Sequence, residues 1–249
     1  MRDLRPEEVA ILREKFYWVA ADERVVPQTT PLADWLDLDT ARERIARVTD
    51  ELGYPNTKLT ASTVTKRHSL LTVAAAFFAI SVLNVRVDLA PENCWLDLNY
   101  AEGPWLAKLP VNAWQGEDLP PVWEEEARRA AVKAAVRELF LQHITPFWSV
   151  LREAGRVNAQ ILWENLAERV YAVYEHKYED LSLEALVRLK TDFAWILNDL
   201  EPADVGLDFN PFQKFNLRDE EGHRIRKTCC LRYQVSHYCH HCPLEKKKR

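Results

Sequence analysis

Four of the five cysteines lie within fourteen residues of one another near the end of this 249-residue chain. Thiolates in this number complete a tetrahedral Zn²⁺ site or hold the two irons of a [2Fe–2S] cluster. Zinc sites usually separate the cysteines of each half by about two to four residues, whereas one half here is an adjacent pair. The spacing therefore favours an iron–sulfur cluster and leaves zinc open. The predicted ligands are Cys229, Cys230, Cys239 and Cys242.

The segment that carries these cysteines is rich in basic residues. From Phe212 onward there are 10 Lys or Arg and 4 Asp or Glu. A cluster with four thiolates is negatively charged and becomes more so on accepting an electron, so cations and hydrogen-bond donors nearby stabilise it. The residues expected around the cluster are Arg226, Lys227, Arg232, Tyr233, His240 and His241.

Two strings of residues at this end of the chain carry a further signal. The string R-x-x-C-C-x-x-Y spans Arg226–Tyr233, and C-x-x-C follows the adjacent cysteines after a spacer of 8 residues. Together with Asn210-Pro211 upstream and the string L-W-x-N at Leu162–Asn165, this ending resembles that of the FhuF-type ferric siderophore reductases. The spacer is shorter than in the family's usual pattern.

The resemblance implies a [2Fe–2S] centre on the four cysteines and one-electron reduction of ferric siderophores, especially hydroxamates, with release of Fe(II). It also implies that Trp163 and Asn165 line a substrate cleft, and no catalytic side chain is expected beyond the cluster ligands. The implied partners are a ferric siderophore and a cellular electron donor. The residues themselves leave two other functions open: an iron–sulfur electron carrier that serves a partner enzyme, and a zinc-stabilised binding module.

Composition places the chain among globular proteins, with 47% hydrophobic and 29% charged residues. The net charge of −5 gives no reason to expect a nucleic-acid partner. The first twenty residues carry charges of both signs and lack the apolar stretch of a secretory signal, so we expect a cytoplasmic protein. The basic end, 245–249, is compatible at most with peripheral association with the inner membrane. Cys94 lies in an apolar stretch and is expected to be a buried thiol.

Hydrophobic periodicity predicts an α+β fold with a predominantly helical body, two small β-hairpins and a C-terminal iron–sulfur module. The apolar stretch 69–85 is shorter than the roughly 20 residues that span a bilayer, so we expect a buried core helix there. One hairpin is predicted from strands at 85–89 and 94–98, the other from 212–217 and 223–228, and a loop over 100–121. Helices are predicted at 6–21, 40–52, 60–82, 122–150, 158–177 and 182–200.

Composition changes after Glu201-Pro202, where the helical pattern ends and the basic, cysteine-bearing segment begins. We therefore expect two units. Residues 1–205 are predicted to be the helical body and the siderophore-binding region, and residues 206–249 the cluster-binding module.

Overall fold

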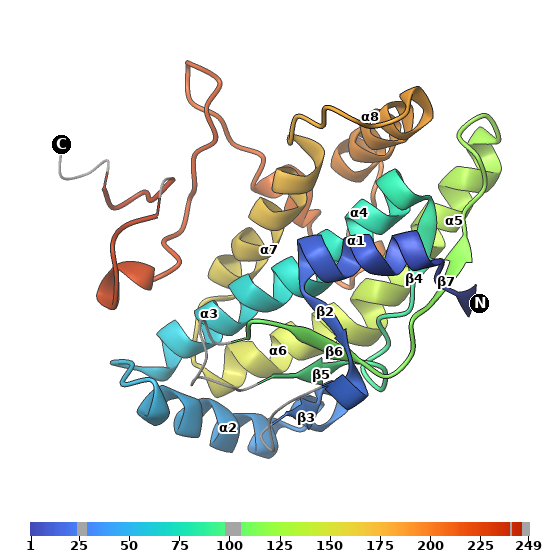
Figure 1. Cartoon of the computed structure of the whole chain (residues 1–249). Helices are drawn as coiled ribbons and strands as arrows, with labels where there is room; N and C mark the ends of the chain where they lie inside the picture. The colour runs from blue at the N-terminus through green and yellow to red at the C-terminus, as the bar shows by residue number, and fades with distance from the viewer. Residues whose placement is uncertain (24–28, 98–105, 240, 246–249) are drawn as a thin grey trace.

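A computed structural model of the chain describes residues 1–23, 29–97, 106–239 and 241–245 (Figure 1). Its centre is a long helix from Thr57 to Leu83, in which π-helical turns join α3 (Thr57–Ser69) to α4 (Ala75–Phe78) and continue beyond it. This helix is long and apolar enough to cross a membrane: it has 27 residues, and its most apolar 18-residue window has a mean hydropathy of 1.3. However, 78% of its most apolar window is buried inside the fold, so the predicted core helix is confirmed.

The other long helices surround this central helix, and α3 contacts α2, α6 and α7. Side-chain caps fix several of their starts: Asp37 accepts the Thr40 N–H at the start of α2, and Ser182 accepts the Ala185 N–H at the start of α8. The fold is thus α+β and dominated by helices, as predicted. The bounds are α1 Pro6–Phe16, α2 Leu38–Glu51, α5 Glu125–Glu138, α6 Thr145–Ala154, α7 Ala159–Tyr174 and α8 Leu183–Asn198.

Two of the predicted helices have different limits in the structure. The first stops at Phe16 because Tyr17 adopts a left-handed conformation (φ 58°), and the next residues form a strand. The helix predicted over 122–150 begins at Glu125 and runs through a π-helical segment, Leu139–Ile144, into α6. Hydrophobic periodicity cannot locate either change, because a single backbone torsion or one extra residue per turn leaves the apolar pattern almost intact.

The strands form three small sheets, and their pairing differs from the first predicted hairpin. Strand β4 pairs with β7 rather than with β5, and β5 pairs with β3, so that hairpin is wrong. The predicted loop over 100–121 is also wrong where β6 and β7 form, and part of it lies outside the described residues. The bounds are β1 Arg2–Asp3, β2 Trp18–Ala20, β3 Thr30–Pro31, β4 Val85–Val87, β5 Trp95–Leu96, β6 Leu109–Val111 and β7 Gln115–Asp118.

Gly116 explains why β7 sits between β1 and β4. A Cβ atom at this position would lie 2.7 Å from Cγ2 of Val85 and 2.8 Å from Cδ2 of Leu4, which is too close for real atoms. Only glycine admits strands this close on both sides. Val87 of β4 therefore pairs with Gly116, 29 positions further along the chain, and the alternation of hydrophobic residues within β4 does not reveal this contact.

The second predicted hairpin is present only at its turn. Arg218 and Arg224 form an antiparallel bridge, but Pro211–Lys214 is a short helix, α9, instead of a strand. Asn210 caps this helix by accepting the N–H groups of Phe212 and Gln213 at 2.8 and 3.2 Å. The pair Asn210-Pro211 is a helix-start signal, and it prevails over the alternation that follows.

The hydrophobic core continues past the predicted boundary at residue 205. Phe212 and Phe215 are fully buried in the same core as the helical body. Beyond them the chain runs along the side of the molecule formed by α3 and α7 (Figure 1), where Asn56 at the start of α3 donates to Gln234 at 3.0 Å. The cysteine-bearing segment therefore begins as part of the body and leaves it only after Phe215.

A pair of buried histidines lies in this core. His68 and His143 are fully buried, their Nε2 atoms are 2.8 Å apart, and Nδ1 of His143 donates to the Leu89 carbonyl at 2.6 Å. His143 Nε2 therefore accepts the Nε2 proton of His68. Burial lowers the pKa of His143 to about 4 and also lowers the pKa of His68, so both rings stay neutral in the folded protein.

We predict that acid destabilises the fold through this pair. The unfolded histidines take up protons below pH about 6.5, whereas folded His143 resists until about pH 4 and the lowered pKa of His68 keeps that ring neutral as well. Stability therefore falls as the pH drops from about 6.5 toward 4, by up to about 1.4 kcal/mol per pH unit for each group. Urea unfolding between pH 7 and 4.5 measures this. His143→Gln, which keeps a donor and an acceptor, should show a shallower loss, and the exposed control His176→Gln should behave as wild type. Identical slopes in all three proteins would contradict the prediction.

Candidate metal centre and adjoining pocket

Helix α7 holds the chain that leads into the cysteines through two consecutive buried polar residues, Glu164 and Asn165. The Glu164 carboxylate is fully buried and accepts the backbone N–H groups of Lys227 and Thr228, both at 2.7 Å, and the Thr228 hydroxyl. A buried carboxylate without such donors would be strongly destabilising. Glu164 therefore selects the backbone conformation directly before Cys229.

Asn165 connects the same helix to the second cysteine by way of α3. Its Nδ2 donates to the Ser62 hydroxyl at 3.0 Å, and its Oδ1 accepts from Nη2 of Arg226 at 2.8 Å. The Ser62 hydroxyl in turn donates to the Cys230 carbonyl at 2.9 Å. Both α3 and α7 thus fix the peptide around Cys230.

The four predicted ligands lie as two close pairs. The sulfurs of Cys229 and Cys242 are 3.8 Å apart, and those of Cys230 and Cys239 are 4.0 Å apart. Two sulfurs bound to one tetrahedral metal at about 2.3 Å are separated by roughly 3.8 Å. Among the described residues, no three or more His, Cys, Asp or Glu side chains are gathered closely enough for one ion. The donor set therefore fits one metal at each pair.

Turns bring the cysteines together. Leu231 adopts a left-handed conformation (φ 66°), and its N–H points to the Cys229 sulfur at 3.3 Å. In the C-x-x-C string, the Cys242 N–H donates to the Cys239 carbonyl at 2.9 Å and closes the turn between these two cysteines. The left-handed turn at Leu231 thus follows directly after the adjacent cysteines.

Positive charge favours the thiolate form of Cys230. The pKa of this thiol is lowered to about 4, mainly by the hydrogen bond that it shares with Cys239 and then by the charges of Lys66 and Arg226. The Lys66 ammonium lies 3.9 Å from the Cys230 sulfur. Burial instead raises the pKa of Cys229 to about 11. The thiolate is the form that binds metal, and the positive charges of Lys66 and Arg226 favour that form at Cys230.

The residues predicted around the cluster occupy different environments. Arg226 is almost entirely buried, with 4% of its side chain exposed. Lys227 and Arg232 are exposed, and only the backbone of Lys227 is held by α7. Tyr233 is 38% exposed and stacks on Tyr238, with ring centroids 5.5 Å apart. Of these, Arg226 is the cation that the fold holds rigidly.

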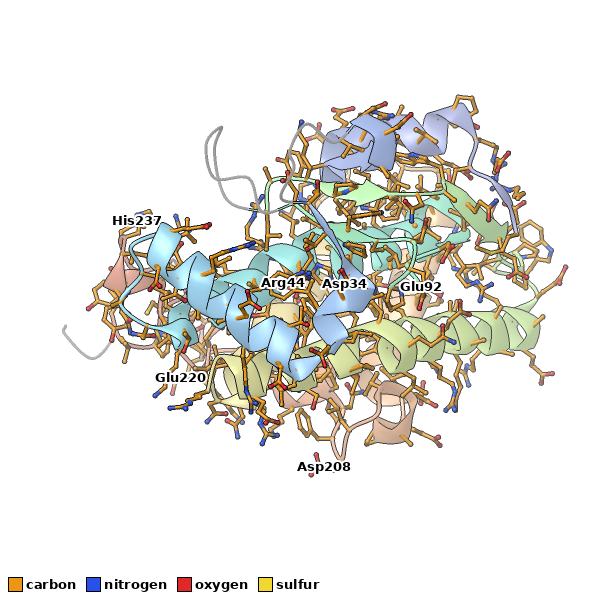
Figure 2. All side chains as sticks on the ribbon, turned by 90° about the horizontal axis from the view of Figure 1, so that it is seen from below. Asp34, Arg44, Glu92, Asp208, Glu220 and His237 are labelled. Carbon is orange, nitrogen blue, oxygen red and sulfur yellow. The ribbon has the colours of Figure 1, made fainter. Side chains whose placement is uncertain are left out.

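The histidines of the segment also differ. Nδ1 of His241 lies 3.5 Å from Oε2 of Glu168 on α7, which keeps this ring against the body. His237 is exposed at the outer end of the segment (Figure 2). His240 lies outside the described residues. His241 is therefore the one of the two predicted histidines that the structure places beside the cysteines.

A cavity of about 370 Å³ opens beside the cysteines and includes Cys239 in its wall. A wider hollow of about 970 Å³ adjoins it and shares Glu175, Arg224, Arg226 and His241. Helix α7 provides most of one wall of the smaller cavity. Its lining residues are Lys66, Asn165, Glu168, Arg169, Tyr171, Ala172, Glu175, Arg224, Arg226, Cys239 and His241.

The two residues predicted to bind substrate differ in position. Trp163 is 5% exposed and stacks on Phe140, with ring centroids 6.3 Å apart, so it is a core residue. Asn165 lines the cavity, but Ser62 and Arg226 occupy its amide group. A direct contact of either with substrate stays a prediction.

Sequence reasoning missed several cavity residues. On α7, Glu168, Arg169 and Ala172 follow Asn165 at spacings of three, four and seven, so they share its helix face. That periodicity was a usable signal. No signal in the sequence pointed to Lys66, because only the packing of α3 on α7 brings it to the same cavity.

A family model described as "Ferric iron reductase FhuF-like transporter" matches residues 63–225. The chain belongs to this FhuF-like family. The match confirms the resemblance noted in the sequence, and it covers most of α3, all of α7 and Arg224. It ends before Cys229, so the cluster motif is not part of it. No curated protein matches the chain.

We predict that Glu164→Gln loosens the cysteine-bearing segment. The amide group of glutamine turns an N–H toward the donors of Lys227 and Thr228, so hydrogen bonds are lost at a cost of about 1–3 kcal/mol. Hydrogen exchange followed by mass spectrometry should show faster exchange over 226–230 and a lower metal content. Glu184→Gln on α8 removes the same charge elsewhere. Equal exchange of this segment in both variants would contradict the role of Glu164.

Proposed function

We propose that this FhuF-like protein is a siderophore-iron reductase that reduces Fe(III)-siderophores by one electron and releases Fe(II). The four cysteines would hold a [2Fe–2S] cluster, with Cys229 and Cys242 on one iron and Cys230 and Cys239 on the other. The observation that carries the proposal is the cavity beside the sulfurs: Cys239 lines it together with residues of α7. A ligand in this cavity would lie against the side chain of a proposed cluster ligand.

The side chains around the cysteines suit this role. A bound [2Fe–2S] cluster supplies one electron at a time. Cys230 and Cys242 are each 3% exposed, so water is kept from these two sulfurs. Lys66 and Arg226 place positive charge where a cluster with four thiolates needs it, and the Leu231 N–H points to the Cys229 sulfur.

Reduction releases iron because of the donors that siderophores use. Hydroxamate and carboxylate oxygens are hard donors that bind the small, highly charged Fe³⁺ much more tightly than Fe²⁺. Uptake of one electron by the bound Fe(III) therefore weakens every metal–oxygen bond together. No general acid, base or nucleophile is required from the protein.

The cavity favours a reductase over a simple electron carrier, since a carrier needs no ligand site beside its cluster. The pairing of the sulfurs favours two irons over one zinc, because a single tetrahedral ion needs four donors gathered around one point. Sulfur distances of 3.8 and 4.0 Å instead join the cysteines two by two. Zinc remains the outcome that a metal analysis must exclude.

The siderophore type, the compartment and the electron donor complete the proposal. The hydroxamate type follows from the family resemblance. The cytoplasm is the compartment in which reduced thiols persist and in which released Fe(II) is used. The electron donor would approach the exposed side of the segment, where Arg232 and Tyr233 lie. Any peripheral contact with the inner membrane would involve the basic end of the chain, and residues 246–249 lie outside the described part.

Metal analysis tests the cofactor. Protein purified without oxygen should be reddish-brown and contain about two irons and two acid-labile sulfides per chain. One zinc per chain without labile sulfide would contradict the cluster and support the zinc-stabilised module.

We predict that Cys239→Ser abolishes both the visible absorbance and iron release. A hydroxyl is a far poorer iron ligand than a thiolate, and this position also lines the cavity. Anaerobic spectra and a colour-forming ferrous chelator measure the two effects after reduction with dithionite. Cys94→Ala is the matched control, because Cys94 is fully buried away from the other cysteines and should change neither signal. Turnover retained in Cys239→Ser would refute the proposed role of the cluster.

A further inference from the structure

The cavity beside Cys239 carries more positive than negative side chains. Four of its lining residues are cations and two are carboxylates, with His241 as the remaining titratable group besides Tyr171 and the cysteine itself. Its volume of about 370 Å³ lies within the usual range for small-molecule sites, about 300–1,000 Å³. The cations are Lys66, Arg169, Arg224 and Arg226, and the carboxylates are Glu168 and Glu175.

Both carboxylates already have partners. Glu175 accepts from Arg218 at 2.5 Å and from Nε of Arg224 at 2.6 Å, so two guanidinium groups share its charge. Glu168 lies 3.5 Å from the His241 ring. Glu164 lies 3.6 Å from Arg226 but does not line the cavity, and its hydrogen bonds go to the backbone before Cys229. Negative charge in the wall is therefore too little to balance the cations.

Three guanidinium groups retain donors with no acceptor. Arg169 makes no hydrogen bond or ion pair within the described part of the chain. Nη1 of Arg224 and Nε of Arg226 are buried and lack a hydrogen-bond partner among the described residues. The side chains of Arg224 and Arg226 are only 7% and 4% exposed. Buried donors without acceptors are costly, but these two atoms have no exposed surface. Arg169, which is only partly buried, is the one of the three that a ligand in the cavity can contact.

Neutralising a cluster would account for only part of this charge. Lys66 and Arg226 act on Cys230 and are explained in that way. Arg224 is held elsewhere, since its guanidinium lies 3.4 Å from the centre of the Tyr171 ring and pairs with Glu175. Arg169 lines the cavity from α7 without any ion pair in the described residues. Arg169 is thus the cation of the cavity wall that is available to a ligand, whereas Arg224 is already bound to Glu175.

We propose, building on the reductase function above, that this cavity selects ferric chelates with a net negative charge over neutral or cationic ones. Iron(III) bound by three hydroxamates is neutral at the metal centre, so the discriminating charge would come from additional carboxylate groups of the siderophore. Carboxylate oxygens are the acceptors that guanidinium groups bind best. The substrate class is therefore an anionic chelate, such as a hydroxamate siderophore that also carries free carboxylates.

The same cations assist the electron-transfer step. The bound Fe(III) takes one electron from the cluster proposed above and becomes Fe(II), and the net charge of the chelate falls by one. No bond to the protein forms or breaks. Positive side chains in the cavity stabilise the more negative product, and they also attract an anionic chelate before reduction.

A matched series of chelates separates charge from iron coordination. One linear tris-hydroxamate with a terminal amine gives a complex of charge +1, its N-acetyl derivative is neutral, and its N-succinyl derivative has charge −1. All three surround the metal with the same six oxygens. Redox-inactive Ga(III) complexes report binding by titration calorimetry on the full-length protein prepared with its cofactor, and the Fe(III) complexes report iron release.

We expect the Ga(III) complex of the succinyl derivative to bind at least about tenfold more tightly than the amine complex, with the acetyl complex between them. The difference should shrink in 0.5 M salt, which screens charges beyond about 4 Å. Arg169→Gln should reduce the succinyl-to-acetyl affinity ratio severalfold, and Arg169→Lys should restore it. Arg152→Gln, an exposed change on α6 with the same loss of charge, should leave the ratio within about twofold. Thermal unfolding confirms that each variant is folded.

Failure of this inference differs from failure of the reductase proposal. Equal affinities for the three Ga(III) complexes, with iron released from the Fe(III) forms, would overturn charge selection and leave the reductase standing. Charge-ordered Ga(III) binding without iron release from any Fe(III) form would support the anionic site and overturn the reductase. A succinyl preference that persists unchanged in Arg169→Gln would also overturn the role given to this cavity.

Discussion

The arrangement of the candidate site depends on one buried carboxylate. Glu164 is fully enclosed by the core, where a carboxylate is tolerated only if donors satisfy it. Its donors are the backbone amides of Lys227 and Thr228 and the Thr228 hydroxyl. The position of Glu164 is set by α7, which packs on the central helix. The backbone that enters the cysteine pair is therefore fixed by the helical body rather than by the short segment itself.

Local signals predicted the helices well, because a helix forms from contacts within a few residues. The hydrophobic periodicity and the apolar stretch 69–85 carried those predictions, and the structure adds the caps at Asp37 and Ser182. Strand pairing was wrong because β4 and β7 are brought together across 29 positions of the chain, and Gly116 alone shows why they fit. The short helix α9 was missed although its start signal, Asn210-Pro211, had been noticed for another reason.

The candidate site could likewise be predicted only in part from the sequence. The cysteines were recognisable by residue type and spacing, since few other patterns place four thiols in so short a stretch. Lys66 was not recognisable, because it comes from a distant part of the chain and meets the cysteine-bearing segment only when α3 has packed on α7. Trp163 and Asn165 were noticed together, yet residues two apart on a helix point to different sides, so α7 directs Trp163 into the core and Asn165 toward the cavity.

The proposed reaction requires a cavity for the chelate and ligands for the cluster, and these come from different parts of the chain. The region that matches the family, 63–225, contains Glu164 and most of the cavity wall, whereas the proposed cluster ligands all follow it. A body that only supported a cluster would need the anchor but not a cavity lined by Arg169, whose guanidinium has no ion pair among the described residues. A body that only bound a chelate would need the cavity but not a buried carboxylate aimed at the backbone before Cys229. Helix α7 carries both the anchor, Glu164, and a residue of the cavity wall, Arg169. The same rigid helix therefore sets the position of the ligand and the position of the sulfurs.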